Sequence, residues 1–482
     1  MASTFAGLSI ATRGLFTSAA ALAVTNNNMS NANTTGYSRQ VVNQQAVGPA
    51  AVYNGNYVGA GSEVTSVTHI RNFRLDQKYW RENGQLGELQ TKSDMLSQIE
   101  AVMGDTDDSS LSAVMEDFYA AMEDLASDPT SSATRAAMKE AGVAVCEYLN
   151  TVSSQLAQLK EDINSEVKTG VDQINAYATQ IAELNAKIRV AAAAGTSTNE
   201  LEDQRTLLID QLSSLADVEV TQTVVGTLPN GADDVKLSVS ISGTTLVSND
   251  QAKQLECYEN GSGTYSIRWQ DTGADFEPEG GLLKACFDLR DGDGTGSQYK
   301  GISYYSNLLD QFAGTFAEAF NAAHSSGYGL DGSTGVDFFA ASDSAAGITA
   351  ANISVAAAIL ADTNKIAAAS SADGGTDNNE NMNALITLCE ESKMFGNSTA
   401  EDFINSIVST LGTASQHAKT MTNKQNSFVT NIDTRRASVS GVSINEETAN
   451  LTKYEAAYEA SAQMIAVWQE IYQTTISMVN TD

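Results

Sequence analysis

The side chains that could carry out chemistry in this sequence are acidic residues in adjacent pairs. General acid–base catalysis needs two carboxylates whose surroundings shift their pKa values apart, and such sites sit in clefts beside specific charge partners. Adjacent acidic pairs occur at several positions, for example at Asp107-Asp108, Asp233-Asp234 and Glu446-Glu447. Because a chain with 59 acidic residues produces such neighbours by chance, we interpret these pairs as solvated surface charge.

The sequence also lacks the usual metal-binding and nucleophilic motifs. The histidines and cysteines are scattered without the spacing of a zinc site, and they stand at His69, His324, His417, Cys146, Cys257, Cys286 and Cys389. Residues 291–296 resemble the start of a calcium loop, but Ile302 stands where the bidentate glutamate belongs, so we expect a turn. Neither HExxH, GxSxG, a P-loop nor a GxGxxG that follows a strand occurs. We therefore expect that the protein is not an enzyme and binds no metal or cofactor. The sequence does not exclude a single disulfide, for example Cys257–Cys286.

Charge and length set the class of protein. The chain has 482 residues, and 59 acidic residues against 27 basic ones give a net charge of −32. So acidic a surface repels phosphates, which argues against nucleic acid and anionic membranes as partners. Hydrophobic residues make up 42% of the chain, which is enough for packed cores, and only four prolines interrupt the helices. Without a run of 18 apolar residues, we expect no membrane span.

The N-terminal segment has the spacing of an amphipathic helix. Its residues step by three and four along Phe5, Leu8, Thr12, Leu15, Ala19 and Leu22. A competing interpretation is a signal peptide cleaved after Ala21-Leu22-Ala23. Because Thr17 and Ser18 interrupt the apolar run, we favour a helix that is retained in the exported protein.

The C-terminal segment carries a second, wider stripe. It steps by three and four along Leu451, Tyr454, Tyr458, Ser461, Ile465, Trp468, Tyr472, Thr475 and Val479. Apolar residues flank this seam at intervals of seven, at Ala457, Met464, Ile471 and Met478. Such a face needs partners. We therefore predict that the two ends pair and assemble with other copies through Phe5, Leu8, Leu15, Leu22, Leu451, Tyr454, Tyr458, Met464, Ile465, Trp468, Ile471 and Tyr472.

Between the two ends, helical and β-rich segments are separate. Residues 71–217 read as helices, the longest running from Thr130-Ser131 to about Ala194, and residues 218–296 alternate with a period of two, as strands do. Helix resumes near Tyr299. The predicted fold is mainly α, a long helical rod or coiled-coil core with paired terminal helices and an inserted β-rich domain. We predict three domains: 1–45 with 445–482, the assembly core; 46–217 with 297–444, the rod; and 218–296, the outer insertion.

Both ends contain motifs that resemble those of bacterial flagellar axial proteins. The N-terminal motif spans residues 27–40 and ends in GYSRQ, which resembles the hook-associated protein 1 family, and its key residues are Asn31, Asn33, Gly36, Tyr37, Ser38 and Arg39. The C-terminal motif includes Gly441, Glu446, Glu447 and Asn450. Three positions depart from the family pattern, with Thr35, Asn445 and Glu455 in place of proline, an acid and glutamine.

Internal segments extend the resemblance over nearly the whole chain. Asp128-Pro129 with Arg135, the segment 199–213, and the stretch from Phe320-Asn321 through His324 to Phe338-Phe339 are similar to elements of the same family. These internal matches argue against hook protein, rod proteins and flagellin.

The resemblance implies a structural protein at the junction between the flagellar hook and the filament. It implies a homo-oligomeric ring as the assembled form, with hook protein and hook-associated protein 3 as neighbours. A flagellar export chaperone would bind the C-terminal helix before export. The protein would be extracellular, exported without a cleaved signal peptide. The alternative from another class is a surface adhesin or binding module carried on a coiled-coil rod.

Overall fold

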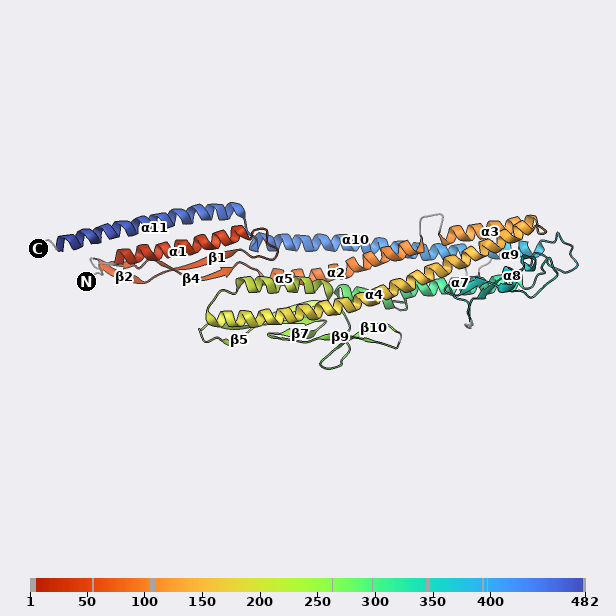
Figure 1. Cartoon of the computed structure of the whole chain (residues 1–482), viewed down its shortest axis with the longest axis horizontal. Helices are drawn as coiled ribbons and strands as arrows, with labels where there is room; N and C mark the ends of the chain where they lie inside the picture. The colour runs from red at the N-terminus through yellow and green to blue at the C-terminus, as the bar shows by residue number, and fades with distance from the viewer. Residues whose placement is uncertain are drawn as a thin grey trace.

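The computed structural model is an elongated molecule with both chain ends at the same extremity (Figure 1). It describes residues 6–53, 56–104, 110–261, 263–296, 298–343, 347–391, 394–396 and 398–479. Helices dominate, and a β-rich insertion lies along one side of the longest helix. The predicted fold class, mainly α with an inserted β-rich part, is confirmed.

The terminal part contains the first and last helices, α1 (Ala6–Ser30) and α11 (Ile444–Val479), which lie side by side (Figure 1). Strands β1 (Gln40–Ala46) and β4 (Ser62–His69) form an antiparallel ladder against α1. Between them, β2 (Pro49–Tyr53) pairs with β3 (Asn56–Gly59). The predicted domain limit at residue 45 falls inside this ladder, so the strands beside α1 extend further along the chain than the predicted terminal domain.

Five helices make the rod, and the longest of them is α4. They are α2 (Phe73–Met103), α3 (Leu111–Ser127), α4 (Ser132–Ala194), α5 (Asn199–Leu215) and α10 (Ala400–Ser440). The side chain of Ser131 accepts a hydrogen bond from the Thr134 amide at the start of α4, and Gly195 ends it with a φ of 72°. The long helix predicted between these residues is therefore confirmed. The helix that follows, α5, begins at Asn199, with Thr198 in the cap position.

The apolar ladder of α4 is the spine of the rod. Its side chains at Val152, Leu156, Leu159, Ile163, Val167, Val171, Ile174, Ile181 and Leu184 are all buried. They pack against α3, α5, α6 and α7 and against strands of the insertion. Each such side chain contributes about 1.5–3 kcal/mol when fully removed from water. The predicted rod thus buries its stripe within one chain, unlike the terminal helices.

The insertion combines two small sheets and one helix. Strands β5 (Val218–Thr227), β6 (Asp233–Ile241), β7 (Thr244–Ser248) and β8 (Gln251–Ala252) form an antiparallel meander. A hairpin of β9 (Leu255–Glu259) and β10 (Tyr265–Trp269) follows. Helix α6 (Gly281–Asp291) was not predicted within this segment; it buries Leu283, Cys286 and Leu289 against the rod.

Aromatic packing holds the end of the rod away from the termini. The elements there are α7 (Ile302–His324), β11 (Phe339–Ala341), β12 (Ile353–Val355), α8 (Ala357–Ala361), the 3-10 turn η1 (Thr363–Lys365) and α9 (Glu380–Glu391). The ring of Phe118 lies 5.6–6.3 Å from those of Phe316, Phe320, Phe338 and Phe339. All five side chains are fully buried.

Residues of the internal motifs hold these elements together. Arg135 is 1% exposed, and its guanidinium donates to the carbonyls of Pro129 and Ile366 at 2.9 and 2.8 Å. The Asn321 carboxamide accepts from the amides of Phe338 and Phe339 and donates to the Phe339 carbonyl. These two side chains supply hydrogen-bond partners to backbone groups of the irregular segments, so their role is structural.

All four cysteines are free thiols, including the pair Cys257 and Cys286 that the sequence left open. Burial raises the pKa of the Cys146, Cys286 and Cys389 thiols to about 12. These three thiols therefore stay protonated and unreactive near neutral pH.

His324 is fully buried, and its two hydrogen-bond contacts fit a neutral ring. Its Nδ1 lies 2.7 Å from the Val336 carbonyl, and its Nε2 accepts from the Ala367 amide at 2.9 Å. Only the neutral tautomer with hydrogen on Nδ1 satisfies both contacts. Burial lowers the pKa of His324, outweighing the hydrogen bond to Val336, which raises it.

This burial predicts a loss of stability in mild acid. Below pH of about 6.5 the unfolded chain binds a proton at His324 that the folded chain does not, so the free energy of unfolding falls by up to about 1.4 kcal/mol per pH unit. Urea unfolding at pH 7.5, 6.5 and 5.5 measures it. In the His324→Gln variant the free energy of unfolding should fall less steeply with decreasing pH. The control variant His417→Gln, at an exposed site, should show the same pH dependence as the native protein. An unchanged slope in His324→Gln would contradict the prediction.

Candidate functional site: the terminal helix pair and its joint

The surface that matters most for function lies on the terminal helices, and the predicted seam of α11 faces α1. Leu451, Tyr454, Ile465, Trp468 and Tyr472 are half-buried there, whereas most other residues of α11 are exposed. The rings of Trp468 and Tyr472 stack 5.9 Å apart along this face. One helix partner thus covers the seam only in part.

Small residues on α1 let the two helices approach closely. A Cβ atom added to Gly7 would lie 2.0 Å from the Trp468 ring, and one added to Gly14 would lie 3.0 Å from the Ser461 hydroxyl. At the same spacing, Ala11, Ser18 and Ala21 are buried. This stripe of small residues was not predicted, although the spacing of seven from Gly7 to Gly14 and Ala21 stands in the sequence.

The large apolar residues predicted on α1 lie beside this stripe. Leu8, Leu15 and Leu22 each stand one position after a residue of the small stripe, so they project about 100° further round the helix, and they remain half-exposed. Phe16 is 67% exposed. Phe5 lies outside the described residues. The edge of the pair therefore presents apolar side chains that the chain itself does not cover.

One flank of α11 is apolar and open to solvent. Successive residues turn by about 100°, which places Met464, Val467, Ile471 and Met478 on one side of the seam; they are 44–69% exposed. Tyr458, in the seam itself, is 38% exposed. On the opposite flank most exposed residues are polar, at Glu455, Glu459, Gln463, Glu470 and Gln473, although Ile444 and Ile476 are exposed there too. Most of the uncovered apolar surface therefore lies on the flank of Met464 and Ile471.

At the base of the pair, Asn28 is the centre of a buried polar cluster. Its carboxamide donates to the Gln40 carbonyl at 2.9 Å and to Glu447 Oε2 at 3.2 Å, and it accepts from the Gln40 amide and the Tyr37 hydroxyl. Asn28 and Glu447 are 1% and 2% exposed. Burial, with Glu200 next in importance, raises the pKa of Tyr37 to about 12, so its hydroxyl remains a donor. This cluster connects the two motifs across the helix pair.

Ion pairs of Arg39 complete that connection. Its Nη1 lies 2.7 Å from Glu446 Oε2, and its Nε lies 2.8 Å from Glu447 Oε1 in an ion pair whose angle is not that of a hydrogen bond. The Arg39 amide donates to the Ser440 carbonyl at the end of α10. The three charged residues predicted from the motifs are thus brought together, although Arg39 is 407 positions from Glu446 in the chain.

The remaining motif residues shape the backbone or lie on the surface. Gly36 has a φ of 82°, and Gly441 has no room for a side chain because an added Cβ would lie 2.4 Å from the Ala437 carbonyl oxygen. Asn31 donates to Asn27 in the first turn after α1. Asn33 is exposed and Asn450 is half-buried. Ser38 contacts the rod, as described below.

Buried charges then join α2, α5 and α10 just beyond the cluster. Arg436 pairs with Asp76 and with Asp210, both at 2.9 Å, and the Trp80 indole donates to Asp210 at 2.6 Å. Burial lowers the pKa of Arg436, but the two carboxylates raise it further, and it stays charged. These residues were not predicted from the sequence because they lie on three separate helices.

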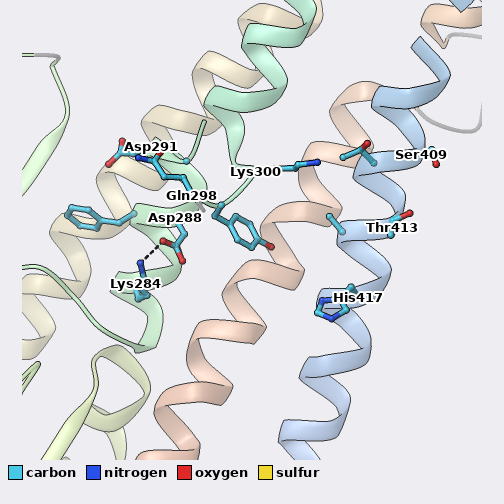
Figure 2. A pocket seen from close by; sticks show the side chains of 13 residues that line it. Lys284, Asp288, Asp291, Gln298, Lys300, Ser409, Thr413 and His417 are labelled. Carbon is cyan, nitrogen blue, oxygen red and sulfur yellow. Dashed lines mark hydrogen bonds and ion pairs between the residues drawn. The ribbon is translucent and has the colours of Figure 1, made fainter. Parts of the chain in front are cut away.

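A groove of about 1050 Å³ opens on the rod between α10 and the segment that links α6 to α7 (Figure 2). Asp288 in this groove pairs with both Lys284 and Lys92 at 2.7 Å, and Asp291 pairs with Arg290 at 2.6 Å. These carboxylates are neutralised by neighbouring cations. Among the described residues, no group of three histidines, cysteines or acids is placed to hold a metal ion.

Helix α1 is also long and apolar enough, by length and composition, to cross a membrane. The same test is passed by signal sequences and by core helices. Here the helix packs between α11 and the β1–β4 ladder. The absence of a membrane partner stays an expectation from the sequence.

Comparison with known proteins agrees with this architecture. Residues 96–339 match the family model described as flagellar hook-associated protein FlgK helical domain, and residues 436–478 match the flagellar basal body rod FlgEFG protein C-terminal model. Flagellar hook-associated protein 1 of Bacillus subtilis is 32% identical over 99% of both chains. The Escherichia coli protein of that name is 27% identical, over 96% of this chain and 98% of its own.

A solved structure with this fold is that of the flagellar hook junction protein FlgK from Burkholderia pseudomallei. It superposes with a TM-score of 0.63 at 17% identity, covering 76% of this chain and all of that one. A helical rod with paired terminal helices, matched by these models, defines a structural component of the flagellum. The chain belongs to the flagellar hook-associated protein 1 family. The resemblance inferred from its motifs is thereby confirmed.

The close approach at Gly7 predicts a specific defect. Gly7→Ala should separate α1 from α11 even though alanine favours helix by about 1 kcal/mol, because the new methyl group would overlap the Trp468 ring. Amide hydrogen exchange across residues 6–30 should become faster. Gly7→Ala combined with Trp468→Ala should recover part of the protection. In the control variant Gly48→Ala the added methyl group meets no atom within 4 Å, so exchange across residues 6–30 should not change. Faster exchange of residues 6–30 in this control would argue against the steric explanation.

Proposed function

We propose that this protein forms the junction between the flagellar hook and the filament. Its terminal helix pair would pack with those of neighbouring copies into a homo-oligomeric ring after export. The observation that carries the proposal is the uncovered apolar flank of α11, Met464, Val467, Ile471 and Met478, beside the half-exposed leucines of α1. A lone helix pair would leave this surface in water.

The partner that best fits this apolar flank is the helix pair of a second copy of the protein. Each apolar side chain of the flank would contribute about 1.5–3 kcal/mol on full burial, and the flank continues along several turns of α11. The opposite flank of α11 is mostly acidic and polar, which limits the faces of this helix that can pack against another copy. Hook protein and hook-associated protein 3 would then be the neighbours below and above the ring, and an export chaperone would cover the same flank before assembly.

Replacing the flank with charge tests assembly. Met464→Asp with Ile471→Asp, expressed in cells that lack the native protein, should weaken chaperone binding and leave hooks without filaments, with unpolymerised flagellin in the medium. The matched control, Gln463→Asp with Gln473→Asp, adds the same charge on the polar flank and should restore swimming. Normal swimming of the first variant would show that the flank is not the interface. Intact flagella with lost surface adhesion in the deletion strain would favour an adhesin instead.

We also propose that the N-terminal helix is retained on export. Helix α1 runs unbroken past the possible cleavage site at Ala23, and Thr25 and Asn28 beyond it are as buried as Ala21 before it. Cleavage would remove Gly7 and Gly14 from the contact with α11. N-terminal sequencing of the exported protein should therefore give residues from the start of α1 or before it. A start at Val24 would show that the segment is a signal peptide.

A further inference from the structure

The terminal part and the rod are joined by three chain crossings, at residues 37–40, 69–72 and 440–443. Each part has its own packing: α1 with α11 and the strand ladder on one side, and the α4 core on the other. The relative orientation of the two parts therefore depends on contacts made at the crossings. Two of the three crossings rest on the first two turns of α5.

Asp203 on α5 holds both of these crossings. Its carboxylate accepts from the Ser38 amide at 2.8 Å and pairs with Arg71 Nη1 at 3.0 Å. His69 Nδ1 lies 3.3 Å from the same carboxylate. The Arg71 guanidinium also donates to the Ser38 hydroxyl at 3.1 Å, which closes a ring of contacts. Burial raises the pKa of Asp203, but the contacts to His69 and Ser38 lower it further, so the charge is retained.

Three neighbouring residues of α5 support the strand ladder. Asn199 donates to the Val67 carbonyl at 3.1 Å and accepts from the His69 amide at 3.3 Å, so its carboxamide pairs with the edge of β4 as a strand would. Glu200 accepts from the Gln40 side chain at 2.8 Å, and Glu202 lies 3.4 Å from His69 Nε2. We name Asn199, Glu200, Glu202 and Asp203 the α5 seat.

The seat is polar and has space beside it. A cavity of about 190 Å³ lies there, with His69, Arg71, Glu202 and Arg205 among its lining residues. Leu207 lies near Gly36, where an added Cβ would meet its side chain at 3.4 Å. Hydrogen bonds and ion pairs depend on alignment and are screened by salt, whereas a packed apolar core would hold the two parts rigidly.

We propose that the α5 seat sets the tilt of the terminal part on the rod, and that Asp203 is the residue on which this tilt depends. Loss of its carboxylate would weaken the hold on the Ser38 and His69 crossings together, while both parts keep their own cores. The functional consequence rests on the proposed function: a subunit whose terminal part can change tilt can meet two lattices of different geometry with one sequence.

Spin-label distance measurements on the full chain test the seat. Labels are introduced through a keto amino acid at the exposed positions Thr65 on β4 and Gln211 on α5, which leaves the native cysteines untouched. The native seat predicts one narrow distance peak. Asp203→Ala should lose this peak and give a broad distribution, and Asp203→Asn, which keeps an acceptor for Ser38, should fall between them. High salt should broaden the native peak by screening the ion pairs.

Asp210→Asn is the matched control, because Asp210 lies on the same helix but contacts only rod residues, Arg436 and Trp80. It should keep the narrow peak. A narrow peak in Asp203→Ala, equal broadening in Asp210→Asn, or a broad peak in the native chain would each overturn the proposal. The measurement needs no assembly, so its failure is distinct from failure of the junction function, which the Met464 and Ile471 variants test.

Discussion

The terminal helices carry more apolar surface than they can bury against each other, and this excess is the constraint on which the other features of the molecule depend. The small stripe of α1 brings α11 close enough for Trp468 to lie over Gly7. Even so, the seam remains half-exposed and the flank at Met464 and Ile471 remains open. A chain with a net charge of −32 keeps such a surface soluble through its many other acids, and it leaves the flank free of charge where other copies would pack.

Charge has a second role where the helix pair meets the rod. The Asn28 cluster and the Arg39 ion pairs lie at the joint, the Arg436 ion pairs connect rod helices just beyond it, and each connects segments that are far apart in the chain. A buried ion pair is weak evidence for stability, because desolvation offsets the attraction, but it fixes which groups meet. The joint thus specifies orientation, while the apolar core of α4 supplies the stability of the rod.

Much of the fold followed from periodicity. The α4 helix, the strands after Val218 and the seam of α11 all have strong repeats, and each repeat reports a face that must be buried. The predictions were weaker where burial is local or the contact is steric. Helix α6 is only 11 residues long, and the strands from Gln40 to His69 were assigned partly to the rod because a short ladder carries little hydrophobic pattern.

The sequence by itself determined the class of protein, the two amphipathic ends and the motif residues that meet at the joint, because local spacing and residue type are written directly in the chain. Only the tertiary structure decided that small residues, and not the leucines, form the closest contact of α1, since a close approach depends on the partner's side chain at that point. It also decided that Asp203, Arg71 and Ser38 share one contact. Groups separated by more than 100 residues meet only when the whole chain is folded, and no local pattern records that meeting.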